Sequence, residues 1–187
     1  MVNQYQPPVL AVNLTSPVGL LSVKASSEGL THLTVVDIDR KSADVEIFEQ
    51  VIELEFNNEQ SDVLKPQQKH QALQHINKVH QQLTEYFGGK RKMFELSLAP
   101  KGTVFQHQVW QALSAMHYGE VCSYSDIANG INRPKAVRAV GAANGANPIA
   151  IIVPCHRVIG KSGKLTGYAY GLAMKQFLLA LEIKYQN

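Results

Sequence analysis

The sequence predicts an α+β protein with two domains, residues 1–97 and 98–187. In the first half, short runs rich in Val, Leu, Ile and Thr alternate with turn residues, which is typical of strands. In the second half, Ser and Thr capping signals precede apolar residues at helical spacing. The charge changes at the same point. The first half has nine Lys and Arg and twelve Asp and Glu, whereas the second has nine and three.

The first domain combines strands with one long helix. Its first three strands are predicted over residues 9–14, 20–25 and 30–38, joined by turns as an antiparallel meander. Further strands are predicted over residues 51–56 and 93–98. Between these two, Pro66 begins a helix whose apolar residues recur at helical spacing as far as Phe87, before two glycines. This pattern predicts a small α+β domain that supports the second domain.

The second domain is predicted to be mostly helical. A capping box at residues 103–106 begins an amphipathic helix, and Trp110 on its apolar stripe belongs to the core. A second capping box, at residues 123–126, begins a short helix that ends at Gly130.

Pro134 then begins another helix, predicted over residues 135–143. Two short helices joined by a tight turn containing Gly match a helix-turn-helix, whose second helix lies in a DNA groove. That second helix carries Lys135 and Arg138 but no acidic residue. Together with the net charge of +6 over residues 98–187, this pattern indicates that the domain binds a polyanion.

Composition excludes several classes of protein. No apolar run reaches the roughly 20 residues that span a bilayer, and the N-terminus lacks the features of a signal peptide, so we expect a cytoplasmic protein with no membrane partner. The chain has two cysteines, Cys122 and Cys155, and no CxxC pair. This excludes a disulfide framework and argues against the usual zinc site, and we predict neither metal nor cofactor.

The chemical centre is predicted around Cys155. A buried apolar run, residues 149–153, leads into Pro154, which stops regular pairing, and then into Cys155, His156 and Arg157. The neighbouring imidazole and guanidinium are expected to favour thiolate over thiol. Disulfide exchange lacks a partner cysteine. Acyl hydrolysis needs a positioned histidine, so His156 would have to act through a water, with Glu182 orienting its imidazole. A third reaction open to the thiolate is displacement of a group from an alkylated base.

The basic half contains four distinctive segments: residues 138–148 (RAVGAANGANP), Pro154-Cys155-His156-Arg157-Val158, residues 166–169 (TGYA) and residues 175–182 (KQFLLALE). In these segments it resembles the O6-alkylguanine-DNA alkyltransferases. The match covers essentially all of residues 98–187. It implies an RNase H-like first domain and a winged helix-turn-helix second domain.

The resemblance implies a self-inactivating methyltransferase that moves an alkyl group from O6-alkylguanine, and from O4-methylthymine, irreversibly to Cys155. His156 would take the thiol proton through a water, with Glu182 holding the imidazole. Tyr124 would help rotate the nucleotide out and stabilise the leaving purine. Arg138 would enter the duplex where the flipped base was, as base chemistry requires extrusion from the stack.

The remaining assignments concern the pocket and the DNA. Asn147 would hold the backbone before the cysteine, Tyr168 would line the base pocket, and the main chain at Val158 and Ala169 would recognise the guanine edge. Lys135 would contact DNA. The family implies binding in the minor groove of double-stranded DNA with little sequence preference, by a monomer.

Two features separate this chain from its family pattern. Tyr170 stands where relatives often have Gly, so it is expected to reduce tolerance of large O6 adducts. The first half has no cysteines, unlike relatives that bind zinc there.

Arg157 is expected to form a structural salt bridge. Two other functions stay open, a non-catalytic sensor of alkylated DNA and a helix-turn-helix regulator in which Cys155 is structural.

Overall fold

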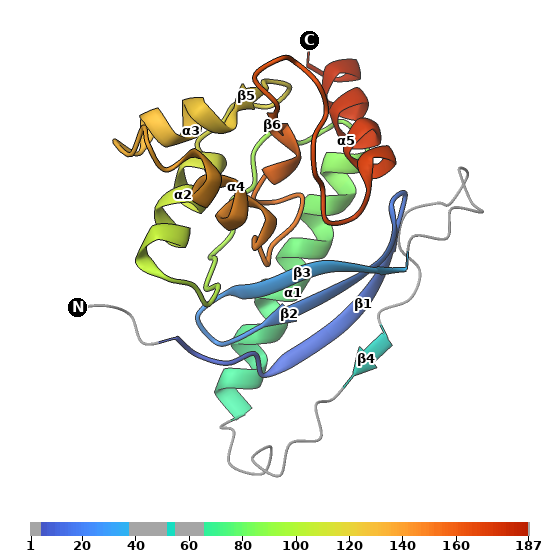
Figure 1. Cartoon of the computed structure of the whole chain (residues 1–187). Helices are drawn as coiled ribbons and strands as arrows, with labels where there is room; N and C mark the ends of the chain where they lie inside the picture. The colour runs from blue at the N-terminus through green and yellow to red at the C-terminus, as the bar shows by residue number, and fades with distance from the viewer. Residues whose placement is uncertain (1–4, 38–51, 55–65, 187) are drawn as a thin grey trace. The chain divides into compact units, whose positions relative to one another are not determined.

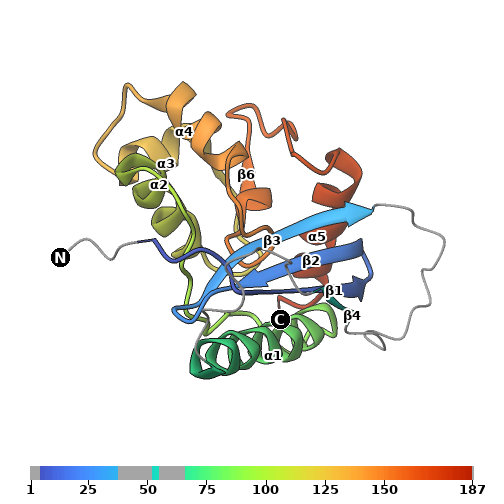
Figure 2. The same cartoon turned by 90° about the horizontal axis from the view of Figure 1, so that it is seen from below.

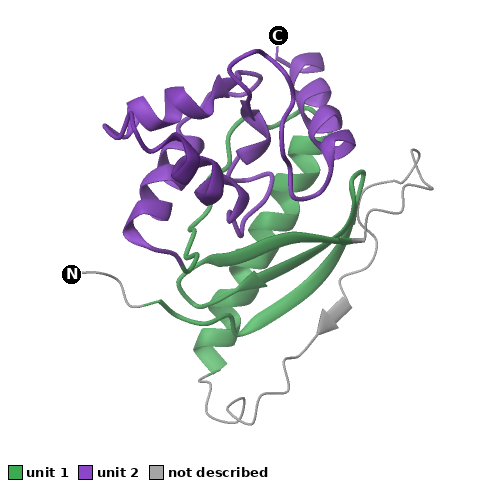
Figure 3. Ribbon diagram, viewed as in Figure 1, with its two compact units in different colours: residues 1–101 green, residues 102–187 purple. Residues whose placement is uncertain are grey.

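The computed structural model describes residues 5–37, 52–54 and 66–186 and divides into two compact units, residues 1–101 and 102–187 (Figure 3). The sequence placed this division at 97/98. The difference arises because residues 97–99 still pair with Leu30, which lies in the first unit. The Leu30 amide donates to the Ser97 carbonyl (2.9 Å), and the Ala99 amide donates to the Leu30 carbonyl (2.8 Å).

The first unit contains a four-stranded antiparallel sheet (Figure 1). Its order is β3-β2-β1-β4. The strands are β1 (Leu10–Ser16), β2 (Gly19–Ala25), β3 (Leu30–Asp37) and β4 (Ile52–Leu54). The predicted meander of the first three strands is confirmed by the antiparallel pairing of β1 with β2 and of β2 with β3. Of the strand predicted over residues 51–56, β4 forms the centre, and the other residues lie outside the described part of the chain.

In the described part of the first unit, one long helix packs on this sheet. Helix α1 (Pro66–Phe87) runs along one face of strands β1 to β3 (Figure 2). Its buried residues include Ile76, Val79 and Leu83, as the predicted apolar spacing requires. The prediction of a strand over residues 93–98 is wrong. Among the described residues, this stretch makes one isolated bridge, between Leu98 and Leu30. Its backbone hydrogen bonds there are the two that join Ser97 and Ala99 to Leu30, too few to form a strand.

The second unit is largely helical. Its elements are α2 (Val104–Ser114), α3 (Tyr124–Gly130), α4 (Val137–Gly145) and α5 (Leu172–Lys184), with a parallel pair of short strands, β5 (Cys122–Ser123) and β6 (Val158–Ile159). Both predicted capping boxes are present, at Thr103 and Ser123. The helices α2, α3 and α4 pack on one another. Trp110 is buried between α2 and α4, where its indole N–H donates to the Ala143 carbonyl (2.9 Å).

The second helix of the helix-turn-helix begins later than predicted. Helix α4 starts at Val137, so Lys135 lies in the turn before it. The Ala136 amide closes that turn on the Arg133 carbonyl (2.8 Å). Pro134 therefore occupies a corner of a turn, a position that its fixed φ also suits, and not the first turn of the helix.

The apolar run before Pro154 is not a strand. Residues 150–152 form turns, and the Val153 amide donates back to the Ile149 carbonyl (3.0 Å). Ile151 is fully buried with φ of 69°, in the left-handed region that a β-branched residue rarely adopts. A 3-10 helix, Cys155–Arg157, follows directly. No helix among residues 5–37 and 66–186 is long and apolar enough to cross a membrane.

Candidate active site

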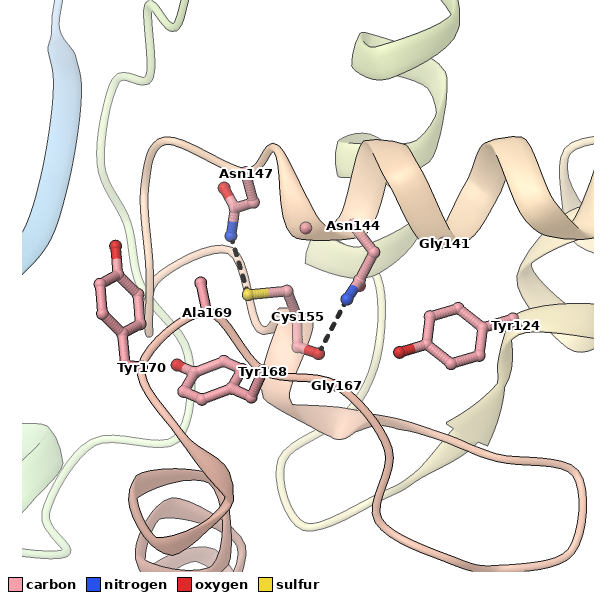
Figure 4. Close-up of a pocket in the computed structure, with 10 residues that line it drawn as sticks. Tyr124, Gly141, Asn144, Asn147, Cys155, Gly167, Tyr168, Ala169 and Tyr170 are labelled. Carbon is pink, nitrogen blue, oxygen red and sulfur yellow. Dashed lines mark hydrogen bonds between the residues drawn. The ribbon is translucent and has the colours of Figure 1, made fainter.

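A pocket of about 330 Å³ lies in the second unit beside Cys155 (Figure 4). Helices α3 and α4 form part of its wall, and the loops that precede the 3-10 helix and helix α5 form the rest. Its larger side chains are those of Tyr124, Asn144, Asn147, Cys155, Tyr168 and Tyr170. The structure therefore brings four of the predicted site residues to one cavity with the cysteine: Tyr124, Asn147, Tyr168 and Ala169.

The Cys155 thiol is nearly enclosed, with 6% of the residue exposed. This burial raises the pKa of the thiol, although a hydrogen bond from Asn147 Nδ2 to Sγ (3.2 Å) opposes the rise. The expectation that His156 and Arg157 favour the thiolate is therefore wrong for the resting protein. Both side chains hydrogen-bond to Glu182 instead of the sulfur. A neutral thiol needs a base that removes its proton when the substrate is in place.

Glu182 is the centre of a buried polar cluster. His156 Nε2 lies 2.8 Å from its Oε1, and Arg157 donates Nε to Oε2 (2.9 Å) and an Nη to Oε1 (3.0 Å). The Gly119 amide also donates to Oε2 (3.1 Å). Burial opposes ionisation of this carboxyl, but His156 and Arg157 outweigh it and hold its pKa at about 2. The structural ion pair predicted for Arg157 is confirmed.

These contacts fix the form of the His156 imidazole. Complete burial lowers its pKa despite the neighbouring carboxylate, so the ring is neutral at rest. A carboxylate only accepts hydrogen bonds, so Nε2 carries the proton and donates to Glu182. Nδ1 is then an acceptor, and it has no hydrogen-bond partner among the described residues. The neutral ring is ready to accept a proton at Nδ1, and the carboxylate stabilises the imidazolium that results.

Asn147 organises the backbone before the cysteine, the role that the resemblance implied. Its Nδ2 donates to the carbonyls of Val153 (2.8 Å) and Ile149 (3.3 Å), and its Oδ1 accepts from the Ile149 amide (3.0 Å). The direct contact between Nδ2 and Cys155 Sγ was not expected from the sequence. One amide therefore holds both the turn and the sulfur.

Lys175 is a site residue to which sequence reasoning gave no role. Although fully buried, its Nζ donates to the carbonyls of Val158 (2.6 Å) and Thr166 (3.0 Å). It thereby joins the segment after Cys155 to the loop that carries Tyr168. Its spacing was a signal: Lys175, Leu178 and Glu182 follow at i, i+3 and i+7 and are all buried on α5.

The aromatic side chains shape the pocket. Tyr168 and Tyr170 meet edge to face with ring centroids 5.6 Å apart. The Tyr168 hydroxyl is buried and has no hydrogen-bond partner in the part of the chain that the structure describes, and burial raises its pKa well above the ordinary value. Tyr124 lies on the other side of Cys155 from Tyr170 (Figure 4). Arg138 and Lys135 are exposed and do not line the pocket.

Comparison with known proteins gives a clear relationship. Residues 104–184 match the family profile of the 6-O-methylguanine DNA methyltransferase DNA-binding domain. Residues 13–100 match the ribonuclease-like domain of the same enzymes. The chain belongs to the 6-O-methylguanine DNA methyltransferase family.

Several relatives of this family cover much of the chain. A methylated-DNA–protein-cysteine methyltransferase of Methanosarcina acetivorans is 44% identical over 167 residues, which are 89% of this chain and 94% of the relative. One from Methanosarcina barkeri is 61% identical over 101 residues, 54% of this chain and 64% of the relative. The crystal structure of Mycobacterium tuberculosis OGT in complex with DNA has a TM-score of 0.71 at 38% identity and covers 92% of each chain.

The mixed α/β architecture predicted for the methyltransferase is confirmed by these matches, with a ribonuclease-like first domain and a DNA-binding second domain. Within residues 5–37 and 66–186 no three His, Cys, Asp or Glu side chains gather as a metal site would require. Both cysteines are free.

Proposed function

We propose that this protein repairs alkylated DNA by transferring an alkyl group from O6 of guanine to Cys155. The observation that carries the proposal is the position of this cysteine. A buried thiol lines a pocket, and a neutral imidazole hydrogen-bonded to a carboxylate follows it in the chain. The names of the relatives, which are methylated-DNA–protein-cysteine methyltransferases, support the same chemistry.

The transfer balances without a cofactor. The Cys155 thiol gives its proton, through a bridging water, to Nδ1 of His156, and Glu182 stabilises the resulting imidazolium. The thiolate attacks the alkyl carbon, an S–C bond forms and the C–O6 bond breaks. The guanine leaves with the electron pair of that bond, stabilised by a hydrogen bond from the Tyr124 hydroxyl to N3. The proton held by His156 then returns through water to the guanine, which restores the neutral imidazole. The thioether is not a leaving group under these conditions, so each chain acts once.

The pocket requires an extruded nucleotide, because O6 cannot be attacked within the base stack. We propose that Arg138 on α4 fills the space that the base leaves, and that Lys135 contacts phosphate from the preceding turn. Both residues are exposed, as such roles require. Small residues along α4 (Gly141, Ala142 and Gly145) suit close approach to the minor groove of double-stranded DNA, in which sequence readout is degenerate.

We assign contacts with the base to Tyr168 and the main chain at Ala169, which line the pocket, and to the main chain at Val158, which follows the 3-10 helix of Cys155. O4-methylthymine is a second substrate in this proposal. We also propose a monomer in the cytoplasm, in keeping with two unpaired cysteines and a DNA substrate.

Intact mass spectrometry with an O6-methylguanine oligonucleotide tests this function. We expect one added methylene per chain, confined to the peptide that contains Cys155. Cys155→Ala should abolish the gain, and the matched control Cys122→Ala should keep it. No gain in the wild-type protein, with DNA binding intact, would contradict alkyl transfer and leave a sensor or regulator of DNA.

A further inference from the structure

Residues 160–166, here called the lysine loop, form an exposed turn outside the helix-turn-helix. The Gly160 amide donates to the Lys164 carbonyl (2.9 Å), and the Gly163 amide donates to the Gly160 carbonyl (2.9 Å). Gly163 has φ of 77°, in the region that glycine adopts without strain. Lys161 and Lys164 are exposed, and the loop contains no acidic residue. The turn therefore presents two positive charges at the surface of the second unit.

A buried side chain anchors both ends of the lysine loop. The Lys175 Nζ donates to the Val158 carbonyl (2.6 Å), just before the loop, and to the Thr166 carbonyl (3.0 Å), at its end. Lys175 is fully buried on α5, so the anchor belongs to the core of the unit. A loop that is held in advance loses less conformational entropy when a ligand immobilises it. The two exposed lysines are thus carried by a pre-organised turn.

The lysine loop starts beside Tyr124. Strands β5 and β6 pair in parallel, with Ser123 opposite Ile159 (Figure 1). Parallel strands run in the same direction, so the segments that follow them leave at the same edge. Tyr124 follows Ser123, and the loop follows Ile159. The pKa of Asp126 is lowered by hydrogen bonds from the Ser123 amide and hydroxyl and also by the charge of Lys161, which agrees with this arrangement.

A DNA phosphate fits this position. Tyr124 lines the pocket that takes the extruded nucleotide, so the phosphates next to that nucleotide lie near the start of α3. The one acidic residue of helices α3 and α4 is Asp126, which is exposed and ionised and therefore repels phosphate. The Lys161 ammonium is close enough to offset this charge, and an ammonium group binds phosphate as a point charge.

We infer that Lys161 and Lys164 bind phosphates of duplex DNA next to the extruded nucleotide and form a second contact with the DNA backbone, outside the helix-turn-helix. The inference rests on the proposed function and extends its DNA-binding surface by one loop. Phosphates are the same at every base pair, so the contact strengthens binding without sequence preference. The loop follows β6, which directly follows the 3-10 helix of Cys155, so the contact also positions the backbone relative to the thiol.

The salt dependence of DNA binding tests the contact. The affinity for an undamaged duplex is measured by fluorescence anisotropy between about 50 and 200 mM salt, and each phosphate contact contributes about 0.9 to the slope of log K against log salt concentration. Lys161→Gln combined with Lys164→Gln should therefore flatten the slope by about 1.8 and weaken binding at 0.1 M salt by about tenfold or more, equally for duplexes of unrelated sequence. Transfer from an O6-methylguanine duplex at a concentration below Kd should slow by the same factor.

Two control pairs separate the charge of the loop from other effects. Lys161→Arg combined with Lys164→Arg keeps both charges and should keep the wild-type slope. Lys69→Gln combined with Lys78→Gln removes two charges from exposed positions on α1 and should keep it as well. A wild-type slope in the glutamine pair of the loop, or an equal flattening by the pair on α1, would overturn the inference. A wild type that binds the duplex but gains no methylene from O6-methylguanine would overturn the proposed function, while the slopes would still test the contact.

Discussion

Replacing Glu182 with Gln should destabilise the second unit by about 3 kcal/mol at pH 7. The pKa of this carboxyl falls from 4.5 to about 2 in the folded protein, and one pH unit corresponds to about 1.36 kcal/mol. Ionisation of Glu182 therefore contributes about 3 kcal/mol of stability. An independent comparison agrees, because loss of one partner from a buried ion pair costs roughly 3–5 kcal/mol, and Arg157 would lose its carboxylate here.

The pH dependence of the stability difference between the wild type and Glu182→Gln is a second, independent test. The folded pKa is depressed, so the contribution is fully present above pH 4.5 and is lost as the pH falls through about 2. A glutamine amide resembles a protonated carboxyl, so the two proteins should become equally stable near pH 2.

Urea unfolding, followed by the fluorescence of Trp110, measures both effects. This is the chain's only tryptophan and it is buried in the second unit. Glu120→Gln, at an exposed position, is the matched control. A difference below about 1 kcal/mol at pH 7, or one that stays constant down to pH 2, would refute the reasoning.

Three further predictions follow from the pocket. Asn147→Leu should destabilise the second unit by about 2 kcal/mol or more, because it removes the hydrogen bond to the Val153 carbonyl and leaves a buried amide unpaired; urea midpoints check this, and an unchanged midpoint would contradict it. Tyr170→Gly should raise the ratio of transfer rates for O6-benzylguanine over O6-methylguanine, and an unchanged ratio would place Tyr170 outside the path of bulky adducts. Iodoacetamide should label Cys155 more slowly at pH 8 in the native protein than in urea, because burial restricts access to the sulfur and raises its pKa; peptide mapping measures both rates as the pH is varied, and rates that rise over the same pH range in both states would disprove the shift.

Local patterns predicted the regular elements well. Helical spacing found α1, and the two capping boxes found the starts of α2 and α3. These signals are contained within a few residues of one another. The start of α4 was placed two residues early because a proline suits both the corner of a turn and the first turn of a helix.

The site was predicted less completely, because its contacts join distant parts of the chain. The motif identified Cys155 and His156, but Arg157 and Glu182 are 25 residues apart, and their pairing determines where the charge lies. Sequence adjacency suggested that the basic groups act on the thiol, whereas the fold turns them toward α5. Asn144 was not singled out because a buried side-chain oxygen that lacks a partner among the described residues can be recognised only when its surroundings are known.

The left-handed conformation of Ile151 has a kinetic consequence. An isoleucine in this region costs about 1–2 kcal/mol, so Ile151 itself disfavours the turn before Cys155. Only the surrounding buried contacts, including those of Asn147, can impose it, so this segment should acquire its native form after the transition state. On refolding, the return of alkyl transfer should then lag behind the return of Trp110 fluorescence. The segment that carries the reactive thiol would be the last part of its unit to form.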